Sequence, residues 1–592
     1  MVSIARHIIA GVAEHPHETS GRADPLPSNA ELADRFELLA DLLELDGADA
    51  FRLSAYRRAA ARIRDSAAPV ARLALEGTAT HIPGIGATIA GKIVEYAETG
   101  DLRALAKLRE RLPSGLVEVM HVPGLGPKTA RRLWADLGIS SLADLRGAAE
   151  AQQLRGLPGI GAKTEERVLA ALARPARAPG TRRALLGRVL PVLREVLAEV
   201  AAHSACERVS DAGSVRRRLE AVRDVDLIAT ASDPAALTAH FVALPRVAEV
   251  AAHGPTKATV VSYDGFRFDL RVVPPESYGN LLQHFTGSKD HNVALREDAV
   301  RRRLSVSEYG VQPEEGEVFR TESEEALYEY LGYSWIPPEL RENRGELEAA
   351  RRGELPPLVE LSDLRGDLHM HTTWSDGRGT LDEMVVRARE LGRRYVAICD
   401  HAKRLRGDLL ERQAEEIRAL GERIDGIEIL SGVEVDIRRD GSLDLDDEAL
   451  AERDWVMASI HSGFEGGRGE LTERLLAAME SPHVDCIGHP TGRKLNRRAP
   501  YELDLDAVFE RAVETGTFLE VNAQPDRLDL TDAVARAASR AGVKIVVSTD
   551  AHRLDELENL ELGVFQARRA WLRAEDIVNT RPWAEVRALM KA

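Results

Sequence analysis

Histidine and carboxylate side chains gather in short motifs over the last third of the chain. They are His369, His371 and Asp376 in GDLHMHTTWSDG, His401 in ICDHAKR, Glu434 in SGVEVDI, His461 in ASIHSG, His489 in CIGHPTGR, and Asp550 with His552 in STDAHR. Imidazoles and carboxylates in such numbers suit Mn²⁺ or Zn²⁺ better than Ca²⁺. A single histidine of this kind is often a hydrogen-bonded core residue, but the whole set predicts a cluster of divalent metals, which can activate water for hydrolysis.

The elements that must position these groups are short apolar runs, each followed by a helical pattern. The runs are YVAICD, GIEILSGVEVDI, WVMASIHS, VDCIGHP, TFLEVNA and KIVVSTDAH. Strands that alternate with helices predict an α/β barrel-like domain over 363–592. Because catalytic groups of such barrels collect at the C-terminal ends of the strands, we expect the nine side chains to meet there.

A second set of carboxylates lies in the middle of the chain. Asp224 and Asp226 alternate along the β-type run DVDLIAT, which places both side chains on one face of a strand. Asp269, in FRFDLRVV, can join them from a neighbouring strand. Three carboxylates suit two Mg²⁺ ions roughly 3.5–4 Å apart, the arrangement for in-line phosphoryl transfer. Two aspartates on a strand are by themselves often only a solvated face.

Three segments in the first third share one pattern, in which apolar-Pro-Gly-apolar-Gly is followed by a helix. They are HIPGIGATIAGKIVEYAETG (81–100), HVPGLGPKTARRLWADLG (121–138) and LRGLPGIGAKTEERVLAAL (154–172). A glycine turn at a helix N-terminus directs free N–H groups outward, which suits a phosphate. Any helical hairpin needs a turn, but three copies with basic residues favour contacts to a nucleic-acid backbone. The expected contact residues are Gly84, Gly86, Gly124, Gly126, Lys128, Gly159, Gly161 and Lys163.

Composition sets the broad class. A chain of 592 residues is too long for one core and predicts several domains. The net charge is −17, yet residues 81–190 carry 17 Lys and Arg against 10 Asp and Glu, so the local charge suits phosphate. Three widely spaced cysteines predict neither a disulfide framework nor a zinc ribbon, and no apolar run approaches a membrane span. We therefore expect a cytoplasmic protein.

The motifs resemble two known families. Gly213-Ser214 followed by Asp224-Val225-Asp226, and HFTGSKDHN further along, resemble the family X DNA polymerases of bacterial or archaeal type. The histidine set is similar to the PHP (polymerase and histidinol phosphatase) domain, a distorted (βα)7-type barrel with three metals. The resemblance implies a multidomain α+β and α/β fold. Its expected parts are a helical DNA-binding domain (1–100), a helix-hairpin-helix domain (101–180), a nucleotidyltransferase palm (181–275), a nucleotide-pocket subdomain (276–340), a connector (341–362) and a PHP nuclease domain (363–592).

The resemblance also assigns residues in the polymerase half. Asp224, Asp226 and Asp269 would hold Mg²⁺ or Mn²⁺. The residues expected to bind the dNTP are Gly213, Ser214 and Arg217 at its triphosphate, and Phe285, Gly287, Ser288 and Asn292 around its nucleoside. Lys92 stands where lyase-active relatives place a Schiff-base lysine, although a plain contact to the DNA backbone explains it better.

In the PHP half, the resemblance implies three Mn²⁺ or Zn²⁺ ions. The first would be held by His369, His371, Glu434 and Asp550, the second by Glu434, His461 and His489, and the third by Asp376, His401 and His552. Lys403 and Arg527 would neutralise phosphate oxygens. For Arg527 a surface salt bridge is an equally good interpretation.

The expected function is repair synthesis on gapped, nicked or primer-template DNA, combined with a 3′–5′ exonuclease activity. Cleavage at abasic sites is a further activity that the PHP domain could have. One chain carries both sites, so a monomer is sufficient. Three alternatives remain open. The polymerase core can be a degenerate DNA holder, as Arg223 and His284 suggest, the protein can be a non-catalytic DNA-end scaffold, or the PHP domain can be a small-molecule phosphatase.

Overall fold

The computed structural model describes residues 26–591 apart from 28, 65–69, 83, 114, 121, 123–124, 158–159 and 174–182. These residues form two compact units, of which the first ends at Arg111 and the second includes everything from Leu112 onward. Within the described ranges, no helix is both long enough and apolar enough to cross a membrane. Gly124, Gly159 and the side chain of Lys163, which we expect to contact DNA, lie outside what is described.

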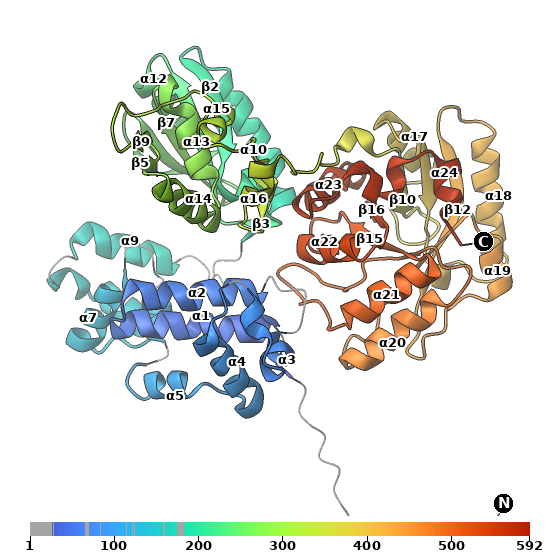
Figure 1. Cartoon of the computed structure of the whole chain (residues 1–592), viewed down its shortest axis with the longest axis horizontal. Helices are drawn as coiled ribbons and strands as arrows, with labels where there is room; N and C mark the ends of the chain where they lie inside the picture. The colour runs from blue at the N-terminus through green and yellow to red at the C-terminus, as the bar shows by residue number, and fades with distance from the viewer. Residues whose placement is uncertain are drawn as a thin grey trace, which may run out of the picture. The chain divides into compact units, whose positions relative to one another are not determined.

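Helices make up the first unit, drawn in blue in Figure 1. They are α1 (Asn29–Asp46), α2 (Ala50–Arg64), α3 (Val70–Leu75), α4 (Ala87–Thr99) and α5 (Arg103–Arg109). Apolar residues recur every three or four positions along α1, and Leu32, Phe36, Leu39 and Leu43 are buried on one side of it. The amphipathic repeat in the sequence therefore predicts this helix correctly.

The second unit begins with another helical region. Its helices are α6 (Leu116–Met120), α7 (Pro127–Leu137), α8 (Leu142–Glu150) and α9 (Ala162–Ala173). Pro127 occupies the first position of α7, where a missing N–H costs nothing, and Gly138 ends the helix with a left-handed φ of 69°. Gly86, Gly126 and Gly161, the second glycines of the three expected turns, directly precede α4, α7 and α9.

A five-stranded mixed sheet follows, in the order β2-β4-β7-β6-β5. Its strands are β2 (Cys206–Ala212), β4 (Asp224–Ala231), β5 (Val247–His253), β6 (Lys257–Ser262) and β7 (Arg267–Val272). Helices α10 (Leu186–Ala201) and α12 (Pro234–Val242) share one hydrophobic core with the sheet residues Val225, Leu227 and Phe268. Since side chains alternate along a strand, Asp224 and Asp226 point to the opposite face. The short strands β1 (Ala184–Leu185) and β3 (Ala221–Val222) pair beside the sheet.

A smaller subdomain then packs around Tyr328 and Leu340. It contains α14 (Lys289–Arg301), β8 (Leu304–Ser307), β9 (Gly310–Pro313), α15 (Glu324–Tyr330) and α16 (Glu346–Arg352). Helix α13 (Tyr278–Thr286) precedes it and packs its apolar side chains against Ala212 and Ile228 of the five-stranded sheet. The first part of the segment expected to be a connector, 341–362, packs into this subdomain. Arg341 is fully buried against Glu324, and Ala350 of α16 belongs to the subdomain core. The many charges of this segment suggested a connector, because a sequence does not show that such charges are paired inside the fold.

The last domain is a parallel barrel, drawn from yellow to red in Figure 1. Its strands pair in chain order: β10 (Gly366–Met370), β11 (Tyr395–Ile398), β12 (Glu428–Asp436), β13 (Trp455–Ser459), β14 (Cys486–Ile487), β15 (Phe518–Asn522) and β16 (Ile545–Ser548). Met370 forms a parallel bridge with Ala551 just beyond β16, so the first and last strands meet and the barrel nearly closes. The prediction of a (βα)7-type barrel is confirmed.

Helices surround this barrel. They are α17 (Leu381–Glu390), α18 (Leu409–Gly421), α19 (Asp447–Ala451), α20 (Arg468–Met479), α21 (Leu505–Thr515), α22 (Asp532–Arg540), α23 (Leu560–Arg569) and α24 (Trp583–Arg587). Capping defines several of them: Thr380, for example, accepts the backbone N–H of Glu383, which in turn binds back to Thr380 before α17. Two barrel-domain side chains, Leu528 and Leu562, complete the core of the palm sheet, so the palm and the barrel share hydrophobic packing.

Candidate active sites

The nine candidate metal ligands of the barrel meet at the C-terminal ends of its strands. Glu434, on β12, lies at the centre. Its Oε1 is 3.2 Å from His489 Nε2 and 3.3 Å from His461 Nε2, and its Oε2 is 2.9 Å from His401 Nδ1. One buried carboxylate therefore faces three imidazoles from three different strand ends.

Two further carboxylates flank Glu434. Asp550 Oδ1 is 3.2 Å from His371 Nε2 and 3.7 Å from His369 Nε2. The two oxygens of Asp376 lie 3.4 Å from His552 Nε2 and 3.5 Å from His401 Nε2. Three groups have their ligand atoms close enough to hold an ion: His369 with His371 and Asp550, His401 with Glu434 and His461, and His371 with Asp376, His401 and His552. His371 and His401 thus each lie between two groups.

These residues fit divalent cations. Among the described residues, the buried Nε2 atoms of His369 and His371, Nδ1 of His401 and Oε1 of Glu434 have no hydrogen-bond partner. Buried polar atoms without partners cost free energy, which metal coordination removes. Burial also lowers the pKa of His371 and of His489 to about 4, so both imidazoles are neutral at pH 7, the form that binds metal.

Carboxylates behind the histidines fix their orientation. Glu520, on β15, binds His369 Nδ1 at 2.7 Å, and Asp436, at the end of β12, binds His461 Nδ1 at 2.5 Å. Each contact occupies one ring nitrogen and leaves Nε2 facing the cluster. Asn522 donates to Asp550 Oδ2 at 3.0 Å and so orients that carboxylate. Glu520 could have been found from the sequence FLEVN, because alternation along β15 places its side chain on the same face as that of Asn522.

The two predicted phosphate-neutralising cations differ in position. Arg527 Nε is 3.5 Å from Asp550 Oδ2, its side chain is only 13% exposed, and this Nε has no hydrogen-bond partner among the described residues. This geometry favours a role at the metal cluster over a surface salt bridge. Lys403 is 39% exposed and lies 3.4 Å from Asp436 Oδ2, the carboxylate that binds His461.

The three aspartates of the palm also come together. Strands β4 and β7 run parallel with Asp226 directly opposite Asp269. Burial, followed by the neighbouring charges of Asp269 and Asp224, raises the pKa of Asp226 to about 6. Gly213 approaches so closely that a Cβ there would lie 2.4 Å from Asp226 Oδ2, so only glycine fits at this position. Crowded carboxylates of this kind need cations between them.

Arginines partly satisfy these aspartates. Arg267 Nε donates to Asp269 at 2.9 Å, and Arg223 Nε donates to Asp224 at 3.0 Å. Burial raises the pKa of Asp269, but hydrogen bonds from Arg267 and Thr259 outweigh it and leave that pKa below its usual value. Because the Arg223 side chain is 71% exposed, it can turn toward solvent when a cation takes its place.

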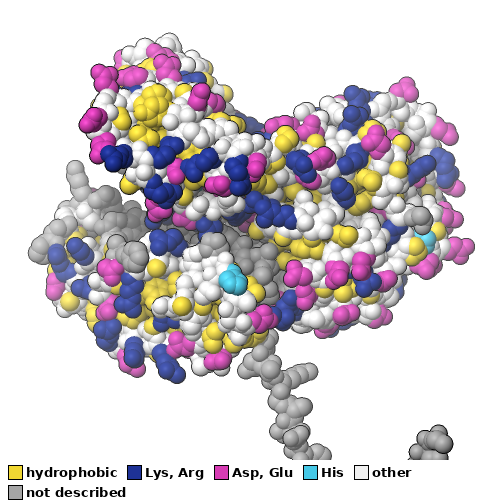
Figure 2. All heavy atoms as spheres, viewed as in Figure 1, with side chains coloured by type: hydrophobic (Ala, Val, Ile, Leu, Met, Phe, Trp, Pro, Cys, Tyr) yellow, Lys and Arg dark blue, Asp and Glu magenta, His cyan; other side chains and the backbone are white. Residues whose placement is uncertain are grey.

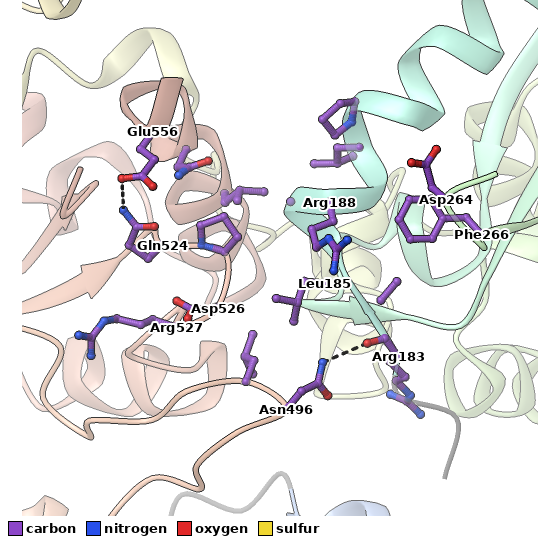
Figure 3. Close-up of a pocket in the computed structure, with 18 of the residues that line it drawn as sticks. Arg183, Leu185, Arg188, Asp264, Phe266, Asn496, Gln524, Asp526, Arg527 and Glu556 are labelled. Carbon is purple, nitrogen blue, oxygen red and sulfur yellow. Dashed lines mark hydrogen bonds between the residues drawn. The ribbon is translucent and has the colours of Figure 1, made fainter. Parts of the chain in front are cut away.

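A cavity of about 2190 Å³ adjoins both groups of acids. Asp224, Thr259 and Arg267 line it from the palm, and Glu434 and Asp550 line it from the barrel. Figure 3 shows the stretch between them, where Arg183, Leu185 and Arg188 face Gln524, Asp526 and Arg527. Asn496 donates to the carbonyl of Arg183 at 3.1 Å and ties the two walls together.

Comparison with known proteins identifies the family. The sequence matches family models described as DNA polymerase beta thumb (residues 281–342), helix-hairpin-helix domain (27–102), SAM-like helix-hairpin-helix tandem (116–174) and PHP domain (367–524). A Bacillus subtilis protein named DNA polymerase/3'-5' exonuclease PolX is 38% identical over 564 residues, which are 94% of this chain and 98% of the relative. The chain belongs to the family X DNA polymerases with a PHP domain.

Other relatives match the barrel alone. A Thermoanaerobacter protein named a probable phosphatase is 30% identical over 225 residues, 36% of this chain and 89% of the relative. A Caldanaerobacter subterraneus protein with the same description is 32% identical over 197 residues, 31% of this chain and 75% of the relative. Both relatives are thus named for reactions on phosphoesters.

The residues predicted to enclose the nucleoside lie on α13, α14 and the turn between them. Asn292 donates to the carbonyl of His284 at 2.7 Å and accepts from Gln283 at 2.8 Å, so its amide is held in place. Ser288 caps α14 by accepting the N–H of His291. Phe285 presents its ring to Arg271, whose guanidinium carbon lies 4.4 Å from the ring centre.

Arg217 and Ser214 lie beside this turn. Ser214 belongs to α11 (Gly213–Arg216), and Arg217 follows it directly. The Arg217 guanidinium donates to the carbonyl of Thr286 and to Glu342. Gly287 has a left-handed φ of 67°, and a Cβ there would lie 3.2 Å from Arg217. The structure thus brings the predicted triphosphate and nucleoside contacts onto facing segments.

The predicted DNA-contact residues that are described lie at helix starts. Gly86, Gly126 and Gly161 directly precede α4, α7 and α9, and Lys128 is exposed in the first turn of α7. Gly84 has a left-handed φ of 93°. Lys92 is half-buried on α4. In Figure 2, Lys and Arg side chains are interspersed with Asp and Glu over the face in view, so local basic groups exist despite the negative net charge.

Proposed function

We propose that this protein is a DNA polymerase and 3′–5′ exonuclease that fills short gaps and trims 3′ ends, with the two reactions in separate active sites. The observation that supports it most is the presence of two groups of metal-ligating side chains, one on the palm sheet and one in the barrel, in a single family X chain. DNA and dNTPs are the substrates of the polymerase reaction.

In the palm, Asp224, Asp226 and Asp269 would hold two divalent cations, Mg²⁺ or Mn²⁺. Gly213 keeps the backbone close to Asp226, and Ser214 and Arg217 would bind the triphosphate. Phe285, Gly287, Ser288 and Asn292 would enclose the nucleoside. Their work is to align the primer 3′ oxygen with the α-phosphate, which is most of what nucleotidyl transfer needs.

In the barrel, the nine ligands would hold up to three Mn²⁺ or Zn²⁺ ions, with Glu434 shared between two of them. Bound divalent cations lower the pKa of water and neutralise phosphate oxygens. Arg527 stabilises the charge that grows on the phosphate, because its open Nε is buried beside Asp550. Glu520 and Asp436 keep the imidazoles aligned.

Two finer assignments remain part of the proposal. Because one chain carries both groups of acids, we propose that a monomer is sufficient for both reactions. We propose that Lys92 contacts the DNA backbone from α4, since its neighbour Gly91 leaves that surface open.

The test is a time course on a 5′-labelled primer at a one-nucleotide gap, with Mn²⁺ and with or without dNTPs. We expect extension by one nucleotide with dNTPs and shortening without them. EDTA should stop both reactions. A small phosphomonoester serves as the second substrate, because the barrel relatives are named probable phosphatases. Rapid hydrolysis of that ester with intact DNA would contradict the proposal and favour the phosphatase interpretation.

A further inference from the structure

Three charged side chains meet where the polymerase half packs against the nuclease half. Arg217 follows α11, Glu342 belongs to the segment after α15, and Arg569 is the last residue of α23 in the barrel domain. The Arg569 side chain is 4% exposed, that of Arg217 is 11% exposed and that of Glu342 is 16% exposed. Buried charges of this kind are tolerated only when each one is paired.

The pairing runs in series through Glu342. Its Oε1 accepts a hydrogen bond of 3.0 Å from Arg217 Nε and another of 3.1 Å from Arg569 Nη1. The same Nη1 atom of Arg569 donates to the main-chain carbonyl of Arg217 at 2.8 Å. Arg569 therefore holds both the backbone of Arg217 and the carboxylate that orients its guanidinium.

Arg569 is itself fixed from its own domain. Its Nη2 donates to Asp532, at the start of α22, at 2.8 Å, and Asp532 also accepts from Arg344. Burial would raise the pKa of Glu342, but the charges of Arg217 and Arg569 outweigh it and hold that pKa below its usual value. Glu342 is thus ionised, and both arginines are needed to balance it in a buried place.

The planar guanidinium explains why an arginine does this work. It can direct parallel N–H groups to several acceptors at once, which a lysine ammonium on a flexible stem does with less geometric control. If Arg569 is lost, Glu342 has only Arg217 to pair with at this oxygen and the carbonyl of Arg217 loses its donor. Glu342 then pairs more strongly with the Arg217 guanidinium and draws it away from the expected triphosphate position. The backbone after Ser214 is also less restrained.

We propose that Arg569, a residue of the nuclease half, is a positioning residue for dNTP binding in the polymerase half, acting on Arg217 through Glu342 and through the Arg217 carbonyl. The inference rests on the proposed role of Arg217 at the triphosphate. Arg569 itself touches neither substrate nor metal ligand. The nuclease domain is in this respect a structural part of the polymerase site.

The neighbouring residue supplies a matched control. Arg568 spans the same contact between the two halves, but it donates to Glu339 at 2.8 Å, to the Val359 carbonyl at 3.0 Å and to Glu360. Removing it weakens the interface without changing any contact of Arg217. Comparison of Arg569→Gln with Arg568→Gln therefore separates positioning of Arg217 from general damage to the interface.

The experiment measures single-nucleotide gap filling at varied dNTP, with the exonuclease rate and melting temperature taken on the same preparations. For Arg569→Gln we expect the KM for dNTP to rise about 10-fold, the size of coupling carried between packed sites, with kcat changed less than 2-fold. Arg569→Lys should restore part of the KM. Arg568→Gln should leave the KM unchanged, and all three variants should keep the wild-type exonuclease rate.

Two additional variants complete the design. Arg217→Ala tests the role on which the inference rests, and it should raise the KM at least as much as Arg569→Gln. In a double variant with Glu342→Gln, the effect of Arg569→Gln should be smaller than in the wild-type background, because a neutral residue 342 no longer needs the second cation.

The outcomes are distinct. A raised KM in Arg217→Ala with an unchanged KM in Arg569→Gln overturns the positioning role alone. An unchanged KM in Arg217→Ala overturns the proposed triphosphate contact and the positioning role together. An equal rise in Arg568→Gln, or a parallel fall in the exonuclease rate of Arg569→Gln, means general damage and also overturns the positioning role.

Discussion

Glu520 offers a sharp test of the metal centre, because it binds no proposed metal directly and yet touches the residues that do. Its Oε1 accepts from His369 Nδ1 and Ser548, both at 2.7 Å. Its Oε2 accepts from the backbone N–H of His489 at 2.6 Å and from Asn522 at 3.1 Å. The carboxylate is fully buried, so these four contacts account for both of its oxygens.

The change Glu520→Gln keeps the shape but removes the charge. A glutamine oxygen can replace one carboxylate oxygen, whereas its NH₂ group faces former donors, of which only the Ser548 hydroxyl can turn to accept, so at least one of the four hydrogen bonds is lost. Partners of this kind behind metal-binding histidines typically contribute 10–100-fold to metal affinity or activity. That range corresponds to about 1.4–2.8 kcal/mol. We therefore expect the Mn²⁺ concentration for half-maximal exonuclease activity to rise about 10–100-fold.

The assay is Mn²⁺ titration of 3′ shortening, with gap filling measured on the same protein at saturating Mn²⁺. Gap filling should stay at the wild-type rate, because the palm aspartates lie on another sheet. Asp485→Asn is the control, since Asp485 is another buried acid of the barrel and accepts the backbone N–H of Val456 instead of a ligand imidazole. An unchanged Mn²⁺ requirement in Glu520→Gln, or an equal change in Asp485→Asn, would refute the reasoning.

Three other perturbations have definite outcomes. Asp269→Asn should lower gap filling at least about 100-fold, as loss of one transition-state contact does, and leave shortening unchanged; loss of both reactions would argue against separate sites. Lys128→Ala should weaken binding to gapped DNA and reduce the slope of log Kd against log salt by about 0.9, read from titrations at several salt concentrations; an unchanged slope means that Lys128 makes no phosphate contact. Burial raises the pKa of Asp485 to about 7, so the stability linked to its protonation is complete below about pH 4 and is lost as the pH rises through 7. Asp485→Asn should therefore raise the melting temperature more at pH 8 than at pH 5, and equal changes at the two pH values would contradict this.

Patterning in the sequence was enough to predict most of the barrel. Its strands are nearly continuous apolar runs because both faces are buried, and the ligands follow these runs at the ends where parallel strands open. The three palm aspartates could also be predicted from the sequence. Side chains alternate along DVDLIAT in β4, and Asp226 lies opposite Asp269 as expected. The glycines before α4, α7 and α9 were predictable for a different reason, because few other residues adopt the backbone conformations that glycine allows.

What the sequence left hidden depends on contacts between distant segments. Strand β5 is exposed along most of its length, so its apolar pattern is weak and it was not expected. The segment from Arg341 was predicted to be a connector, because its charges do not reveal that Arg341 pairs with Glu324 inside the fold. Arg569 is 352 residues from Arg217, and no spacing rule connects them.

The central claim is that one chain adds and removes nucleotides at two separate sites. The most direct measurement is an edit-and-extend assay, in which a 5′-labelled primer with a mismatched 3′ nucleotide is incubated with Mn²⁺ and all four dNTPs. Wild type should first shorten the primer and then extend it. Asp226→Ala should stop at the shortened primer, Glu434→Gln should fail to shorten it, and a mixture of the two variants should recover the extended product. Loss of shortening in Asp226→Ala, or wild-type shortening in Glu434→Gln, would contradict the account.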